Sequence, residues 1–278
     1  METKTKAKKK FFKGNAFLYI GGIITAVMLA VIIISFFWTP FNPTAMDSAA
    51  KMAGPNSIHI LGTDNLGRDI LSRIMKGAGT TFLISVCVVA IGCICGIIIG
   101  SLCGYFGGIA DAVLTRVCDT ITAFPAILLA LVIISITGGG TMNVIIVLGI
   151  LFIPSFARIV RSEYARIRTQ NYIESARLMG ASSFRIIFVH ILPNTMAVLL
   201  PAITIGFNNA VLSEASMSFL GIGVKPPAAS LGSMLRDAQT YLRNTPWYAI
   251  STGIAIALLI LGFSLLSEGL QQASRKEE

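Results

Sequence analysis

The sequence predicts an all-α integral membrane protein with about six transmembrane helices. Hydrophobic residues make up 54% of the 278-residue chain and charged residues only 13%, about half the charged share of a typical soluble domain. Apolar runs long enough to cross a bilayer recur along the chain and are separated by short polar segments. The length accommodates several spans in one domain and leaves no room for a large soluble domain.

Six apolar runs are expected to cross the membrane, at about 20 residues per crossing. In chain order they are Phe17–Trp38, Thr81–Phe106, Asp119–Thr137, Met142–Ala157, Met196–Ile222 and Trp247–Leu266. The first follows a Lys-rich tail, is longer than the apolar core of a signal peptide and ends in aromatic residues, so we expect an uncleaved span with a cytoplasmic N-terminus. The fourth is short and reaches full length only if it continues to Val160, with Arg158 extending towards the interface.

The distribution of basic residues orients these spans. Six spans place both termini and the long polar segment between spans four and five on one side. The segments on that side carry 15 of the 22 Lys and Arg residues, and those on the other side carry 7. Because the cytoplasmic side carries the excess, we expect a multi-pass protein of the cell membrane with both termini in the cytoplasm. The net charge of +9 then reflects orientation, and no basic patch with aromatic residues on a soluble module predicts nucleic-acid binding.

The polar segment Arg158–Asn194 holds six Arg and two Glu residues and cannot lie in lipid. Its apolar residues recur at helical spacing on both sides of Gly180, which stands where a short helix requires a left-handed C-terminal residue. Ser182 and Ser183 can cap a second helix, and Pro193 ends that helix or opens the next. We expect a helix, a glycine turn and a helix at the membrane surface, although periodicity alone equally allows a loop that only solvates the membrane face.

This segment resembles the EAA loop of binding-protein-dependent ABC importer permeases, whose pattern is Glu-Ala-Ala, three residues, Gly, nine residues and Ile-x-Leu-Pro. The matching residues here are Glu174, Ser175, Ala176, Gly180, His190, Leu192 and Pro193. The sequence departs from the pattern at Ser175 and His190, and its His-Ile-Leu-Pro-Asn string resembles the peptide/nickel branch. In that family the short helix before the glycine docks in a cleft of the ATPase subunit. The resemblance therefore implies that these residues other than His190 couple the chain to an ATPase, and that arginines of the segment pair with acidic groups on the ATPase.

A second motif lies in residues 39–79, which we expect outside the membrane. Thr63 or Asp64 can cap a short helix there, and Asp64 and Arg68 stand one helical turn apart, as in an ordinary surface helix with ion pairs. The string LGTDxxGRDxLSR nevertheless resembles the signature of C-type permease subunits of dipeptide, oligopeptide and nickel importers. Its motif residues here are Gly62, Thr63, Asp64, Gly67, Arg68 and Asp69.

Three features inside the spans carry further expectations. The fifth span contains three polar residues, for which we weight interhelical hydrogen bonding and a role in a substrate pathway equally. They are Asn208, Asn209 and Glu214. The second span carries glycines at four-residue intervals, for which we favour close helix packing over a channel lining: Gly92, Gly96, Gly100 and Gly104. Phe124-Pro125 predicts a bend in the third span, as a static kink or a hinge.

The resemblance implies a permease subunit that moves di- or oligopeptides, or nickel and other metal-chelate solutes, into the cell. The implied partners are a homologous B-type permease, two cytoplasmic ABC ATPases that bind ATP and Mg, and an external substrate-binding protein. No G-x-x-x-x-G-K-[ST] loop occurs in the sequence, so we expect a non-catalytic chain without a cofactor or metal of its own. Residues 1–79 would form the tail, first span and external motif, and 80–278 a five-span core with the EAA loop at 158–194.

Two other classes of protein are disfavoured. A self-sufficient secondary transporter or channel predicts coupling-ion carboxylates near mid-membrane and an internal repeat, whereas the sequence offers Glu214 and no clear repeat. An intramembrane enzyme needs a metal or nucleophile constellation. The two histidines, His59 and His190, are expected on opposite sides of the membrane.

Overall fold

The computed structural model describes residues 2–274, without the side chains of residues 2–15, 110, 270, 273 and 274. Arg275 and Lys276, which contribute to the predicted charge asymmetry, lie outside the described residues. Within residues 2–274 the chain is helical and contains no β-strand beyond an isolated bridge between Thr63 and Asp69. The predicted all-α fold class is confirmed.

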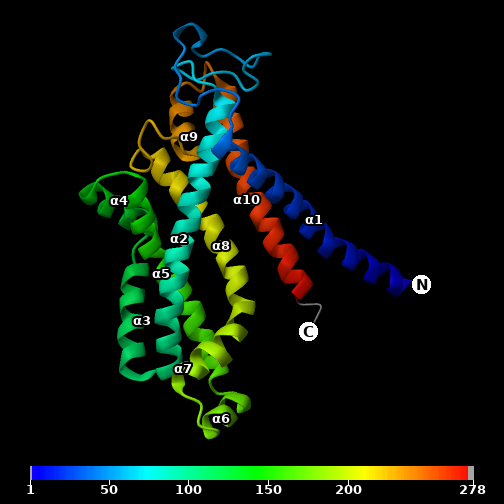
Figure 1. Cartoon of the computed structure of the whole chain (residues 1–278), viewed down its shortest axis with the longest axis vertical. Coiled ribbons are helices and arrows are strands. Elements are labelled where there is room, and N and C mark those ends of the chain that lie inside the picture. Colours follow the sequence, from blue (N-terminus) through cyan, green and yellow to red (C-terminus); the bar gives the residue numbers. More distant parts are fainter. Residues whose placement is uncertain (1, 275–278) are drawn as a thin grey trace. The chain divides into compact units, whose positions relative to one another are not determined.

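Among the described residues, five helical runs are long and apolar enough to cross a membrane (Figure 1). They are α1 (Glu2–Phe37), α2 (Ile70–Phe106), α5 (Thr141–Ile167), the continuous run of α7 (Ser183–Arg185), a π-helix (Ile186–Ile191) and α8 (Leu192–Phe219), and α10 (Pro246–Ser274). Helix α5 continues beyond the expected end of the fourth span, so Arg158, Arg161 and Arg166 lie on this helix and not in a loop.

The expected third span is a bent pair of helices, α3 (Gly108–Thr122) and α4 (Ala126–Thr137), which would supply a sixth crossing if it acts as one span. The two axes differ by 85°. Pro125 accounts for the break, because its ring and missing N–H prevent a continuous helical turn and push Phe124 out of the helical conformation. The predicted bend is present, and it is far sharper than a kink.

The described chain forms two compact units. The first contains residues 2–85, 137–144 and 211–274, and the second contains residues 86–136 and 145–210. In the first unit α1 packs along α10, and α10 also contacts α9 (Leu231–Thr240). A one-turn 3-10 helix (Ser48–Ala50) interrupts the long connection between α1 and α2.

The second unit is built on a close contact between α2 and α5. A Cβ added to each of the four glycines of the α2 stripe would lie 2.5–2.8 Å from an atom of α5. The opposing residues, in order from Gly92 to Gly104, are Phe152, Phe156, Ala157 and Arg161. Since real Cβ atoms essentially never approach so closely, only glycine permits this contact. The predicted role of the stripe in helix packing is confirmed, and its partner is α5.

Candidate functional site

The predicted helix–glycine–helix segment is present in the second unit, and its first helix is α6 (Asn171–Leu178). Ile173 and Ala176 are buried and anchor this two-turn helix. Gly180 has φ +83°, as its position predicts. The Ala181 N–H donates to the Ala176 carbonyl and the Gly180 N–H to the Arg177 carbonyl, both at 3.0 Å. This pair of bonds is a Schellman motif, which requires a left-handed residue at the position of Gly180.

The second predicted helix is continuous with the fifth span. Ser182 caps its start, because its hydroxyl accepts a hydrogen bond from the Arg185 N–H (3.3 Å). Pro193 therefore lies in the first turn of α8 and does not end a separate helix. The preceding π-helix explains how a proline is tolerated, since the extra residue relieves the clash between the ring and the preceding turn.

Two side chains satisfy carbonyl groups of the π-helix. The fully buried Tyr164 of α5 donates its hydroxyl proton to the Ile187 carbonyl (3.1 Å), and the Asn194 amide donates to the His190 carbonyl (2.6 Å). The Tyr164 bond attaches α5 to the helix that leads from the loop into the membrane. The sequence offers no signal for Tyr164, which precedes its partner by 23 residues.

The tip of this segment is exposed and apolar. Leu178, Met179 and Phe184, which flank Gly180, are 87%, 82% and 72% exposed. Glu174 and Ser175 are also exposed, and no ion pair joins Glu174 to another residue of the described chain. Of the other motif residues, Ala176 is buried, Leu192 is half-buried, and Gly180 and Pro193 are exposed. An exposed apolar tip on a buried anchor is the form of a protein-docking surface.

The arginines of residues 158–194 divide into two groups. Four are satisfied within the chain: Arg158 by Asp119 (3.0 Å), Arg161 by both oxygens of Asp111, Arg166 by Glu163, and Arg168 by the Tyr105 carbonyl (3.0 Å). Arg177 lies over the Tyr105 ring, 5.9 Å from its centroid, and Arg185 is exposed. The expectation that these arginines pair with acidic groups of an ATPase can therefore apply to Arg177 and Arg185. Arg158, Arg161 and Arg168 join elements of the second unit, whereas Arg166 pairs within α5.

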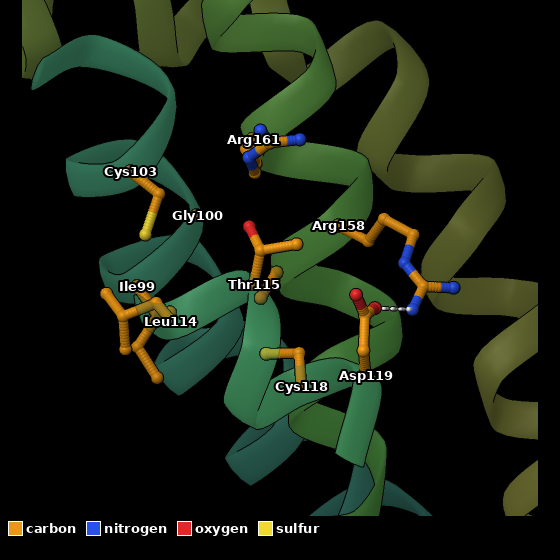
Figure 2. A pocket seen from close by; sticks show the side chains of 10 residues that line it. Ile99, Gly100, Cys103, Leu114, Thr115, Cys118, Asp119, Arg158 and Arg161 are labelled. Atoms are coloured by element: carbon orange, nitrogen blue, oxygen red, sulfur yellow. Dashed lines mark hydrogen bonds and ion pairs between the residues drawn. The ribbon is translucent and has the colours of Figure 1, made fainter. Parts of the chain in front are cut away.

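Figure 2 shows where α3 is attached to α5 by one of these pairs. A cavity of about 100 Å³ lies among α2, α3 and α5, with Arg158 and Asp119 paired at its edge. Its wall is mostly apolar and includes Cys103 and Cys118, both free thiols. No group of three or more His, Cys, Asp or Glu residues that could hold a metal occurs within the described part of the chain.

The external motif is not the surface helix that we expected. Residues 62–69 form a turn closed by the Thr63–Asp69 bridge, and α2 begins only at Ile70. Gly62 and Gly67 both have positive φ, and a Cβ at either position would collide with neighbouring backbone. The predicted helix is therefore wrong. The two glycines reverse the chain direction and let the turn pack closely against residues 47–54.

The charges of this motif form a buried cluster in the first unit. The Asp64 carboxylate is fully buried and accepts from Arg68 Nε (2.7 Å) and from Arg73. Both guanidinium groups also approach Asp237 of α9, at 3.9 Å from Arg68 and 3.6 Å from Arg73. One carboxylate oxygen of Asp69 accepts hydrogen bonds from the Ser72 hydroxyl and the Ser72 N–H. His59 Nδ1 lies 2.9 Å from the other oxygen of Asp69. These contacts attach the motif to the start of α2.

Glu214 is also fully buried in the first unit. Its carboxylate accepts hydrogen bonds from the hydroxyls of Thr81 (2.8 Å) and Ser218 (2.6 Å). Thr81 in turn accepts from the Leu231 N–H at the start of α9 (3.1 Å). Asn208 and Asn209 are not among its partners: Asn209 is exposed, and Asn208 is half-buried. In this conformation Glu214 joins α2, α8 and α9.

Comparisons with known proteins agree with this architecture. A family model for the binding-protein-dependent transport system inner membrane component matches residues 96–276. The dipeptide transport system permease protein DppC of Haemophilus influenzae is 34% identical over 269 residues, which cover 95% of this chain and 91% of that protein. The glutathione transport system permease protein GsiD of Salmonella paratyphi A is 40% identical over 266 residues, which cover 95% and 88%.

A solved structure shares the fold. The MetNI methionine ABC transporter, in an inward facing conformation, aligns with a TM-score of 0.62 at 20% identity, over 73% of this chain and 97% of that one. These similarities define a multi-pass membrane permease of the ABC importer type. The chain belongs to the family of binding-protein-dependent transport system inner membrane components, and within it to the C-type permeases of peptide importers, as its two motifs predict.

Proposed function

We propose that this chain is the non-catalytic C-type permease subunit of an ATP-driven importer and that its ATPase docks on α6, Gly180 and α7. The observation that carries this proposal is the exposed apolar tip of Leu178, Met179 and Phe184 on a helix anchored by buried residues. Large apolar side chains gathered at one exposed turn favour a protein partner over water. Glu174, Ser175, Ala176, Gly180, Leu192 and Pro193 are the proposed coupling residues.

The helix geometry supports a path for the coupling motion. Residues 183–219 form one helical run, and only the hydrogen-bonded turn at Gly180 separates it from α6, so a displacement of α6 can reach the fifth span. The Tyr164–Ile187 hydrogen bond adds α5 to this path. ATP and Mg bind to two partner ATPases, whose closure moves α6; this chain supplies the moving helices and no phosphate-binding loop.

The substrate and the remaining partners follow from the family. The relatives compared above are named for dipeptides and glutathione, which favours peptides over the nickel or metal-chelate solutes that the resemblance also allows. A homologous B-type permease would complete the pathway, and an external binding protein would deliver the peptide. The excess of Lys and Arg supports a cytoplasmic location for both termini and α6.

The docking surface can be tested by removing its apolar side chains. The double substitution Leu178→Ser and Met179→Ser should leave the membrane level of the chain unchanged, because both side chains are exposed. It should reduce co-purification of the ATPases and peptide uptake in cells at least about tenfold, since two apolar contacts are lost from an interface. Glu174→Lys, which reverses an exposed charge without an ion pair in the described chain, should act in the same direction.

A matched control removes similar side chains from the first unit. Ile58 and Ile60 are 67% and 64% exposed and lie in the segment that we propose faces outside. Ile58→Ser with Ile60→Ser should retain the ATPases. The proposal is refuted if both double variants bind the ATPases equally well.

A further inference from the structure

The first unit contains an open cavity of about 530 Å³ that the coupling mechanism does not use. Its wall is formed by the turn of the external motif, the start of α2, the 218–230 segment and α9. A volume of this size lies within the range of small-molecule binding sites, about 300–1,000 Å³. It is several times the volume of the cavity beside α3.

Cationic groups outnumber anionic groups in the wall of this cavity. Arg68, Arg73 and Arg236 line it together with Asp237, and the fully buried Asp64, which is not part of the wall, pairs with Arg68 and Arg73. Asp64 is shared by Arg68 and Arg73, whereas Arg236 is exposed and forms no ion pair with any side chain that the structure describes. One positive charge is therefore left over. A guanidinium group that lines a cavity without a partner is suited to bind a carboxylate.

The backbone holds Arg236 in place. Its guanidinium group lies directly against Gly221, which has φ +85°, so that a Cβ at this glycine would collide with the guanidinium. Close contact with a glycine orients a long side chain that would otherwise be free in solvent.

The same cavity also presents unused hydrogen-bond acceptors. The Oδ1 atom of Asn65 is buried and accepts no hydrogen bond from the described residues. Asp237 is 41% exposed, and its contacts with Arg68 and Arg73 are long, at 3.9 and 3.6 Å, so its oxygens retain capacity for another donor. A buried acceptor such as the Asn65 oxygen is costly unless a ligand donor or water satisfies it. These groups suit an ammonium or peptide N–H.

We infer that this cavity is a binding site for a short zwitterionic peptide. The carboxylate of the peptide pairs with Arg236, and its N–H groups donate to Asn65 and Asp237. The apolar wall at Met46, Leu66 and Val224 takes a side chain. The inference rests on the proposed function and deepens it. It means that the permease itself binds peptide, at the end of α2 that we propose faces outside. The cavity volume favours a small ligand over a single acidic side chain of the external binding protein, which would fill little of it.

The test uses the purified importer complex without its external binding protein. The probe is a tripeptide with a photoreactive central residue, offered with a free or an amidated C-terminus, and mass spectrometry locates the label. The free acid should label the chain between Asn65 and Arg73 or between Val224 and Tyr241. Amidation should raise the half-saturating concentration at least about tenfold, because one charge-assisted hydrogen bond is lost.

Two arginine variants sharpen this result. Arg236→Gln should raise the half-saturating concentration by a similar factor, whereas Arg243→Gln, an exposed arginine outside the cavity, should not change it. Label elsewhere, equal labelling by acid and amide, or equal effects of the two variants overturns the inference. The acid–amide comparison requires no variant, so poor folding of Arg236→Gln would not prevent a decision.

Two further outcomes distinguish this inference from binding of the external protein at the cavity and from the proposed function. If the peptide leaves no label in the cavity but Arg236→Gln weakens binding of the external protein, the carboxylate belongs to that protein and the inference is wrong. If the complex retains its ATPases and transports peptide yet shows no label in the cavity, this inference fails and the proposed function stands. Loss of ATPases in the Leu178 and Met179 variant concerns the proposed function alone.

Discussion

The two family motifs of this chain have opposite environments. In the external motif Asp64, Arg68 and Asp69 are buried and bonded to one another or to neighbouring elements. In the EAA loop, residues 158–194, Glu174 and the apolar residues around Gly180 are exposed. The first motif is therefore built as an internal brace and the second as a contact surface, although both read as short polar strings in the sequence. The comparison predicts that changes in the first region lower stability and that changes in the second affect partners.

The largest expected effect is in the external motif. Asp64→Asn leaves Arg68 and Arg73 buried without their shared carboxylate. Removal of one partner from a buried ion pair costs about 3–5 kcal/mol, so we expect a clear loss of folded protein in the membrane. The measurement is the thermal unfolding midpoint of the purified chain in detergent. Glu174→Gln is the control, since the same chemical change at an exposed site should leave the midpoint where it is; matching losses in both variants would contradict the assignment of the motif as a brace.

A smaller effect is expected beneath the EAA loop. Tyr164→Phe removes the hydroxyl that donates to the Ile187 carbonyl and changes little else in a fully buried site. Loss of one hydrogen bond should lower the free energy of unfolding by about 1 kcal/mol. Because this bond ties α5 to the π-helix, uptake per ATP hydrolysed should also fall. Tyr19→Phe serves as the control, because Tyr19 is exposed on α1, outside the proposed coupling path; an unchanged transport ratio in Tyr164→Phe would remove α5 from the coupling path.

Local backbone chemistry made part of this structure predictable. Gly180 was identifiable because a helix that ends in a Schellman motif needs one left-handed residue, and glycine tolerates that conformation. The glycine stripe of α2 was predictable because a four-residue period marks one helix face that another helix can approach. Five of the six expected spans follow from apolar length alone, and the third is the exception.

Contacts between distant residues were not predictable. Arg68 and Arg73 meet Asp237 from across the sequence, so nothing near the motif shows that its charges are buried. Arg161 likewise finds Asp111 fifty positions away, and it was expected to face an ATPase. The sharp break at Pro125 exceeds the predicted bend, because a proline restricts the residue before it as well as its own turn. Burial of a charge depends on which partner the fold supplies.

The most direct test of the coupling claim compares two residues at position 180. A Cβ there meets no atom within 4 Å, so the φ of +83° alone decides what is tolerated. Gly180→Val places a β-branched residue in a left-handed conformation, at about 1–2 kcal/mol, and should re-aim α6, whereas asparagine adopts this conformation readily. We predict that Gly180→Val reaches the membrane at normal levels but loses bound ATPases and peptide uptake, and that Gly180→Asn retains both. If Gly180→Val retains the ATPases and transports as well as Gly180→Asn, the loop only solvates the membrane face and the coupling account is wrong.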